Sequence, residues 1–196
     1  MAYSVEKLVC PGCGFPVDAS MKECPAGHPI NISTFNNVFD MPIPMVNKYA
    51  SKYNKDLIDL PDDKKLNIGV GICYLKLKLY DKALSAFEKT MKDNFDNSEV
   101  YFYAAVSLLQ GKKAFLHQRV TIDKVLEYID AALMIEQKGI YYYFEAYIKY
   151  DYFSRKFLNV SPNYQELLQT ARSVGVSNLE IEQLYSILSV PRPNVL

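Results

Sequence analysis

The sequence predicts a mainly α-helical protein with a small, non-helical module at its N-terminal end. Apolar residues recur at helical spacing through most of the chain after residue 44. Prolines and turn-forming residues concentrate before that point, and three of the four cysteines fall with one of the two histidines within residues 10–28. These patterns divide the chain into a module at 1–34, a connector at 35–61 and a helical repeat domain at 62–196.

The N-terminal cluster has the spacing of a metal site. Cys10 and Cys13 form a Cys-x2-Cys pair, and Cys24 and His28 form a Cys-x3-His pair after a ten-residue gap. Both pairs include proline and glycine, which suit a tight turn whose amide N–H groups point at thiolate sulfur. Three thiolates and one imidazole give a tetrahedral donor set that zinc accepts readily. Because the protein fills all four positions, we expect structural rather than catalytic zinc.

Residues 8–34 resemble a zinc ribbon, in which two such turns end short hairpins. The segments "FPV" and "HPINIS" would supply the strand-like flanks. The intervening "DASMKE" is short, so a reduced ribbon and a bare pair of turns are both open. Three rival readings compete with zinc. A redox Cys-x2-Cys motif leaves Cys24 and His28 unused, rubredoxin-type iron normally has four thiolates, and chance clustering involves no metal.

The predicted connector begins with "FNNVFDMPIP", whose two prolines forbid a continuous helix. One short amphipathic helix is expected after it, with Pro44 in the first turn. Its apolar side chains at helical spacing are Val46, Tyr49, Ala50, Tyr53 and Leu57.

The helical domain opens with a predicted hairpin of two helices, and Asp62 or Asp63 is the expected N-cap. Small and aromatic residues then follow the signature of a repeat of about 34 residues. These residues are Gly71, Tyr74, Tyr80, Ala83 and Phe87. The unit resembles a tetratricopeptide repeat, and the resemblance implies an α-solenoid of stacked helical hairpins.

Two weaker units follow, and each carries an insertion. In the second unit, "GKKAFLHQRVT" delays the second helix, and in the third an insertion separates Ala146 from Tyr164. The matching residues are Tyr101, Ala104, Ala105, Leu108, Val125, Ile129 and Ala132, then Tyr142, Ala146, Tyr164, Leu168 and Ala171. The last helix, "NLEIEQLYSILSV", is expected to cap the stack, because a terminal repeat must cover its apolar face.

The resemblance to tetratricopeptide repeats also implies a partner surface. In that family, first-helix residues line most of the concave face, which here would be apolar and aromatic. The residues at those positions that we expect to bind a partner peptide or helix are Ile68, Ile72, Phe102, Val106, Tyr143, Tyr147 and Tyr150. The alternative is that the tyrosines pack between repeats, and we assign Tyr142 to that packing face. The expected function is therefore that of an adaptor.

No residue pattern points to an enzyme. His117 lies in a polar insertion without a neighbouring nucleophile in the sequence. Gly69 and Gly71 lack the rest of a phosphate-binding loop and indicate close packing within a helix. Cys73 stands in an apolar segment and is expected to be a buried thiol without a metal.

Net charge and hydropathy limit the classes of partner that we expect this chain to bind. Lys plus Arg and Asp plus Glu both total 22, so no excess positive charge draws the chain to nucleic acid or anionic lipid. A zinc-ribbon nucleic-acid-binding or transcription-related regulator is the alternative hypothesis, although residues 10–29 contain one lysine and no arginine. No signal-peptide pattern is present, and no apolar run approaches about eighteen residues. We therefore expect a cytoplasmic protein without membrane contacts.

Overall fold

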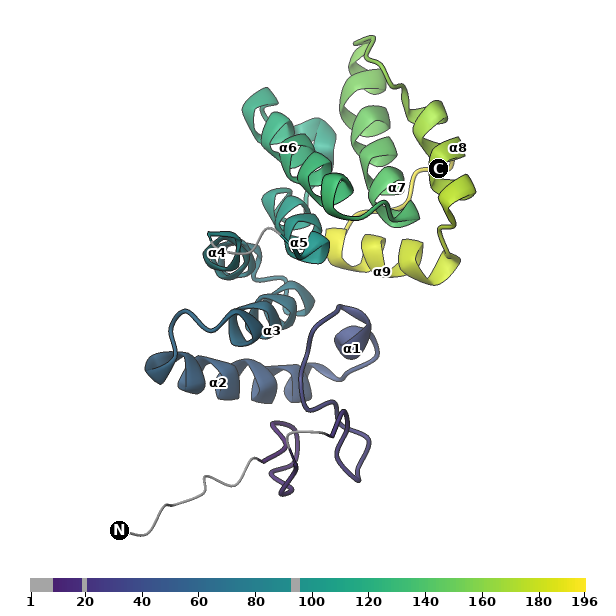
Figure 1. Cartoon of the computed structure of the whole chain (residues 1–196). Coiled ribbons are helices and arrows are strands. Elements are labelled where there is room, and N and C mark those ends of the chain that lie inside the picture. Colours follow the sequence, from purple (N-terminus) through teal and green to yellow (C-terminus); the bar gives the residue numbers. More distant parts are fainter. Residues whose placement is uncertain (1–8, 19–20, 93–95) are drawn as a thin grey trace, which may run out of the picture.

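The computed structural model describes residues 9–18, 21–92 and 96–196, and this part of the chain is mainly helical, as predicted (Figure 1). The helices are α1 (Asn36–Phe39), α2 (Ile43–Asp59), α3 (Lys64–Lys76), α4 (Tyr80–Met91), α5 (Ser98–Leu108), α6 (Arg119–Ile135), α7 (Gly139–Ile148), α8 (Tyr164–Val174) and α9 (Asn178–Leu188). Within the described residues there is no strand, and the only extended pairings are two isolated bridges, Val9 with Pro16 and Glu23 with Pro29.

Side chains at the helix starts explain where several helices begin. Of the two candidates for the first cap of the helical domain, the structure selects Asp63, whose carboxylate accepts the Leu66 N–H at 2.8 Å. Asn163 and Ser177 begin α8 and α9 with capping boxes, each completed by a glutamate three residues further on. Local sequence therefore sets these boundaries.

The helices from α2 to α8 pack against one another in chain order (Figure 1). Contacts are most extensive within the pairs α3 with α4, α5 with α6, and α7 with α8. Gly71 allows the first pair to approach closely, because a Cβ at this position would lie 2.7 Å from the Phe87 ring. The fold is therefore a repeat-like row of helical hairpins.

The segment predicted as a connector belongs to the same core as the hairpins. It contains α1 as well as the 17-residue α2, which packs along α3. Val38, Val46 and Tyr49 are fully buried in one cluster with residues of the later helices. The Phe35 N–H donates to the Tyr103 hydroxyl at 2.9 Å. Residues 35–61 are thus part of the helical domain, which corrects the predicted division.

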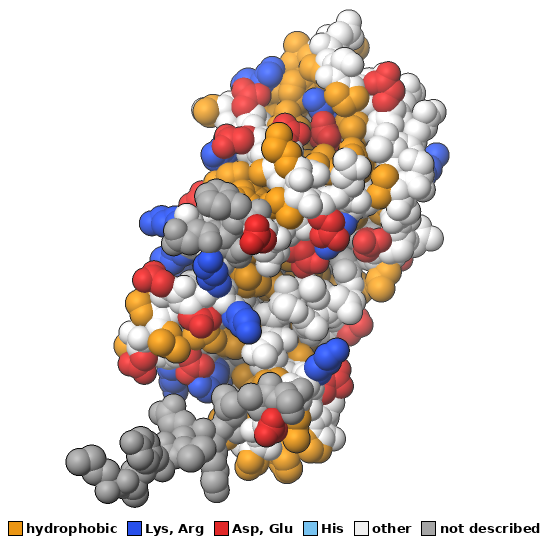
Figure 2. Space-filling view, viewed as in Figure 1, with side chains coloured by type: hydrophobic (Ala, Val, Ile, Leu, Met, Phe, Trp, Pro, Cys, Tyr) orange, Lys and Arg blue, Asp and Glu red, His pale blue; other side chains and the backbone are white. Residues whose placement is uncertain are grey.

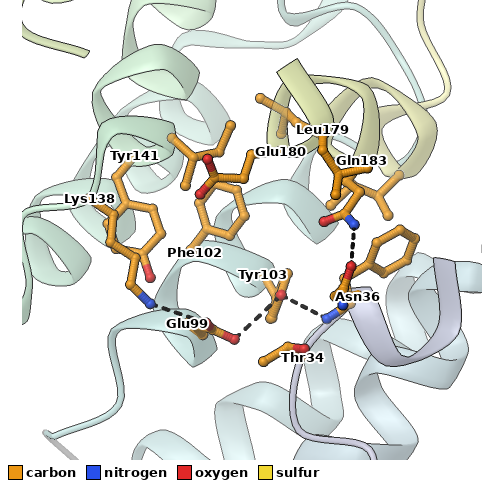
Figure 3. Close-up of a pocket in the computed structure, with 14 residues that line it drawn as sticks. Thr34, Asn36, Glu99, Phe102, Tyr103, Lys138, Tyr141, Leu179, Glu180 and Gln183 are labelled. Atoms are coloured by element: carbon orange, nitrogen blue, oxygen red, sulfur yellow. Dashed lines mark hydrogen bonds and ion pairs between the residues drawn. The ribbon is translucent and has the colours of Figure 1, made fainter. Parts of the chain in front are cut away.

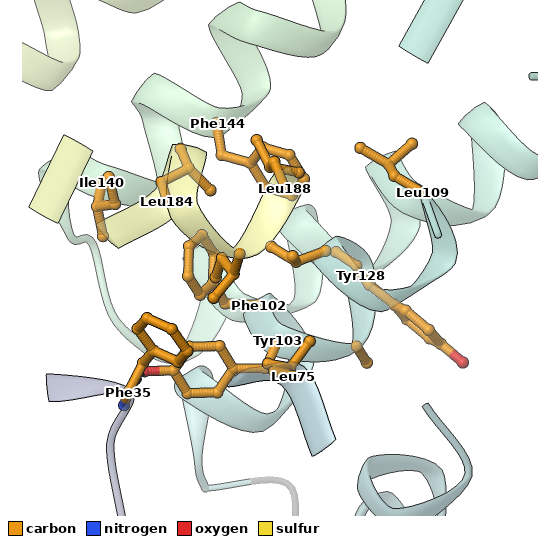
Figure 4. Close-up of a cluster of buried hydrophobic side chains, with 14 of the residues drawn as sticks. Phe35, Leu75, Phe102, Tyr103, Leu109, Tyr128, Ile140, Phe144, Leu184 and Leu188 are labelled. Carbon is orange, nitrogen blue, oxygen red and sulfur yellow. Dashed lines mark hydrogen bonds between the residues drawn. The ribbon is translucent and has the colours of Figure 1, made fainter. Parts of the chain in front are cut away.

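α9 does not extend the row of helices beyond α8. It packs across α5 and α7, and Leu184 of α9 lies with Phe102 and Phe144 in a buried cluster (Figure 4). The Tyr80 hydroxyl at the start of α4 also donates to the Ile187 carbonyl at 2.8 Å. The prediction of a capping helix is therefore wrong, because α9 buries its apolar face against the first helices of the hairpins.

The two insertions in the repeat pattern lie together. The first contains a short 3-10 turn, η1 (Ala114–Leu116), and the second begins with a π-helical turn, η2 (Lys149–Phe153), and a 3-10 turn, η3 (Ser154–Lys156). The Phe115 N–H donates to the Asp151 carboxylate at 2.9 Å, which ties η1 to η2.

In the portion of the chain that the structure covers, no helix combines the length and the apolar character needed to cross a bilayer.

Candidate metal centre and partner surface

Two similar turns carry the four predicted metal ligands. In the first, the Cys10 N–H donates to the Phe15 carbonyl at 2.8 Å, and the Gly14 N–H donates to the Cys10 carbonyl at 2.8 Å. In the second, the Cys24 N–H donates to the His28 carbonyl at 2.9 Å, and a glycine N–H again returns to the cysteine carbonyl at 2.8 Å. Each turn has one glycine at a φ of 75°, a left-handed conformation that glycine adopts without a steric penalty.

The turns bring the donor atoms of Cys10, Cys13, Cys24 and His28 within 4.8 Å of one another. The Sγ atoms of Cys13 and Cys24 are 3.8 Å apart, and Cys24 Sγ lies 3.6 Å from Nδ1 of His28. Cys10 and Cys24 are buried, whereas Cys13 is exposed. The predicted set is therefore assembled in space and can hold a metal ion.

Backbone amides favour the thiolate form of one ligand. Desolvation disfavours ionisation of Cys24, but hydrogen bonds from the backbone N–H groups of His28 and Ala26 and from the Cys10 and Cys13 thiols together outweigh it and lower the pKa of the thiol to about 7. Thiolate is the form that binds metal. By contrast, burial raises the pKa of Cys73 to about 12, so this fourth cysteine is the inert core thiol that its apolar context predicts.

The turns rest on α2. The Tyr49 hydroxyl donates to the Pro29 carbonyl at 2.6 Å, and the Tyr53 hydroxyl accepts the Ile32 N–H at 3.0 Å. Burial, and then the neighbouring Cys10, raise the pKa of Tyr49, so its hydroxyl stays a neutral donor. Two buried tyrosines from one helix therefore hold the second turn and the segment after it.

The partner surface predicted from the repeat pattern is not an open groove. Ile72, Phe102, Val106, Tyr143 and Tyr147 are buried, with at most 5 % of their surface exposed. Ile68 and Tyr150 are half-buried. The prediction of an open partner surface is therefore wrong, because two other helices lie over the inner face of the hairpins.

The covering helices give the physical reason. α9 lies over α5 and α7, and α1 packs on α3. The Tyr185 ring of α9 meets the Tyr147 and Tyr143 rings edge-on, with centroids 5.9 Å and 6.4 Å apart. A helix of the same chain thus covers the rings of Tyr143 and Tyr147, although the Tyr143 and Tyr185 hydroxyls are buried without a hydrogen-bond partner.

A cavity of about 280 Å³ remains beside α9 (Figure 3). Its floor is aromatic, with Phe102 and Tyr103 from α5 and Tyr141 from α7. Glu99 and Lys138, 3.1 Å apart, form an ion pair at one side. Residues 34–36 and the exposed side of α9 close the other side, where the Gln183 amide donates to Asn36 at 2.9 Å.

Sequence reasoning missed the contribution of α9 to this cavity. Leu179, Glu180 and Gln183 line it, but the last helix was assigned to the end of the stack. The capping box at Ser177 signalled that a helix begins there. No local signal states which surface that helix covers.

Acidic and basic side chains are interspersed over the visible face of the molecule (Figure 2). This distribution accords with the formal net charge of zero.

Comparison with known proteins gave no match to a family model, a curated protein or a solved structure. The case for a function therefore rests on the chemistry and geometry of the chain itself.

Proposed function

We propose that this protein is a non-enzymatic interaction scaffold that binds a short segment of a partner protein and is stabilised by a structural zinc ion. The observation that carries the binding proposal is the aromatic cavity between α5, α7 and α9. The pairwise packing of helices from α3 to α8 supports a tetratricopeptide-like solenoid as its frame.

The donor distances support zinc at the cysteine–histidine cluster. With Zn–S bonds of about 2.3 Å and a Zn–N bond of about 2.0 to 2.1 Å, a tetrahedral site has S–S edges of about 3.8 Å and S–N edges of about 3.5 to 3.6 Å. The corresponding distances are 3.8 Å from Cys13 to Cys24 and 3.6 Å from Cys24 to His28. Four protein ligands leave no position for a reacting water, so the metal would stabilise the fold.

Elemental analysis of protein purified without added metal tests the zinc site. We expect one zinc per chain, and its loss in Cys24→Ser. Cys73→Ser is the matched control, because this buried thiol lies outside the cluster and its replacement should leave the zinc content unchanged. A folded N-terminal module without metal, or with iron, would contradict the proposal.

The size and lining of the cavity favour a protein segment as the ligand. A volume of about 280 Å³ lies at or below the lower end of small-molecule sites and suits one or two anchoring side chains. The aromatic floor would receive an apolar anchor. The rim offers the carboxylates of Glu99 and Glu180 and the ammonium group of Lys138 to polar groups of the segment.

α9 itself indicates what the inner face accepts. It is an amphipathic helix whose apolar side is seated on α5 and α7, as partner helices are in helix-in-groove recognition. A partner segment in the cavity would lie against the exposed edge of α9, next to Leu179, which is 50 % exposed.

A photo-crosslinker at position 179 can identify the partner, whose affinity is then measured with purified components. We expect Leu179→Glu to weaken binding by about 1 to 3 kcal/mol without lowering the melting temperature, because it puts a charge at the apolar entrance. Val120→Glu on α6 is the matched control, since Val120 is also an exposed apolar residue and does not line the cavity. Equal affinities of the two variants would refute the site.

A further inference from the structure

A second cavity, of about 390 Å³, lies where three segments distant in the sequence meet. Lys113 comes from the first insertion, Arg155 from the second, and Arg192 from the segment after α9. Tyr147 and Tyr150 contribute their phenol groups, and Asp151 is the acidic residue in the lining. Three cations therefore share one hollow.

The fold holds these groups in place. The Asp151 carboxylate accepts the Phe115 N–H at 2.9 Å and the Arg155 guanidinium at 2.5 Å, which joins the two insertions. The Arg192 guanidinium lies 5.9 Å from the Tyr143 ring centroid and donates to the Leu196 carbonyl. The segment after α9 is thereby held against α7.

Basic side chains outnumber acidic side chains in the lining of the cavity. Asp151 is 2 % exposed and is already committed to Arg155. Neither Lys113 nor Arg192 has a carboxylate side-chain partner in the described part of the chain, and both are exposed. Lys113 therefore has no described acidic partner, and the Arg192 guanidinium, which is bonded to the Leu196 oxygen, lines the same cavity, so an anion that enters meets positive charge on two sides.

The geometry points to a phosphate monoester as the ligand, a site that is independent of the cavity beside α9. Guanidinium groups present planar pairs of N–H donors that match phosphate oxygens, and Lys113 adds a compact positive charge. The Tyr147 hydroxyl is already engaged by the Ala114 N–H and by Asp151, so the half-buried Tyr150 is the phenol that can donate to the ligand. A phosphate monoester also offers three acceptor oxygens to donors on several sides of the cavity, whereas a carboxylate offers two.

Titration with inorganic phosphate and with phenyl phosphate, at constant ionic strength, tests this site. At a tenfold excess over the dissociation constant, a ligand that binds only the folded state should raise the melting temperature by about 3 to 6 °C in a domain of this size. A phosphotyrosine peptide distinguishes the source: tighter binding than phosphate indicates a modified protein, and equal binding indicates a small phosphate. Equal binding of acetate, or no shift with any phosphate, would overturn the inference.

Single substitutions test which side chains bind the phosphate. We expect Arg192→Gln and Lys113→Gln each to weaken phosphate binding by about 10-fold to 100-fold, as expected for the loss of a charge-assisted hydrogen bond. Both residues are exposed, so the fold should be retained. Lys112→Gln is the matched control, because Lys112 is the exposed neighbour of Lys113 and does not line the cavity. An equal loss in Lys112→Gln would show that only general charge matters and would refute the site.

Discussion

Gly12, between the first two cysteines, decides how closely the two cysteine-containing turns approach each other. A Cβ at this position would lie 3.1 Å from Cγ of His28 and 3.1 Å from Sδ of Met45, a residue of α2. These distances are shorter than ordinary van der Waals contact, so the imidazole or the methionine would have to move. The absence of a side chain at position 12 therefore sets the position of the histidine ligand against α2.

We predict that Gly12→Ala lowers zinc affinity by about 10-fold to 100-fold, the range seen when groups that orient a metal ligand are altered. Competition with a chromophoric chelator measures the change. Gly14→Asn is the control, because a Cβ there meets nothing within 4 Å and asparagine tolerates the left-handed conformation of this residue. If Gly12→Ala and Gly14→Asn bind zinc equally well, the space that Gly12 leaves beside His28 does not fix the position of the imidazole.

Within helices, glycines set the distance between neighbouring elements. At Gly139, the first residue of α7, a Cβ would lie 2.8 Å from the Ala171 carbonyl oxygen and 2.8 Å from backbone atoms of Gly175 and Val176. At Gly71 of α3, it would instead meet the Phe87 ring at 2.7 Å. Backbone at the end of α8 cannot rotate away, whereas a ring can shift slightly at the cost of disturbing its neighbours.

We predict that Gly139→Ala lowers the free energy of unfolding by about 3 kcal/mol, and Gly71→Ala by about 1 to 2 kcal/mol. Part of each cost is offset by the better helix propensity of alanine, about 1 kcal/mol within a helix. Urea denaturation of both variants measures the difference. A smaller loss at Gly139 than at Gly71 would show that the α7–α8 contact relaxes more easily than its backbone geometry indicates.

At the scale of the whole molecule, the described residues form two hydrophobic cores of very different size. The larger extends from Ile32 to Leu196, and the smaller consists of Cys10, Cys24 and Ile30 with Val17 against them. So few apolar side chains cannot offset the conformational entropy lost when the two turns become ordered. A metal ion bound at the proposed site would supply that free energy, whereas the helical domain has its own core.

We predict that a chelator unfolds the two turns at residues 9–18 and 21–31 and leaves α3–α9 folded. Hydrogen exchange measured by mass spectrometry should show lost protection in the N-terminal turns, with helicity in circular dichroism nearly unchanged. Global unfolding on chelation would mean that α2, which bonds to the turns through Tyr49, depends on the metal as well.

α9 packs against hairpins that are distant from it in the sequence, so a weaker packing of α9 should destabilise the whole helical domain. We predict that Leu184→Ala, at a residue 1 % exposed, costs about 2 to 5 kcal/mol of stability in a single cooperative transition. Leu179→Ala on the exposed side of α9 is the control and should cost less than about 1 kcal/mol. A separate early transition would show that α9 detaches while the hairpins stay folded.

The sequence by itself determined the features that depend on neighbouring residues. The spacing of Cys10, Cys13, Cys24 and His28 sufficed to predict the donor cluster, because two short turns bring these side chains together with little help from the rest of the chain. Helical periodicity and an N-cap at Asp62 or Asp63 likewise predicted helices and a boundary, and the structure selects Asp63.

Only the tertiary structure decided what covers each apolar face. Periodicity placed Tyr143 and Tyr147 on the inner face of the hairpins, and burial by α9 made them core residues instead of a partner surface. In the same way, α1 and α2 joined the core instead of forming a connector. The hydrophobic effect is non-directional, so a pattern of apolar residues requires burial without specifying whether the covering surface belongs to the same chain or to a partner.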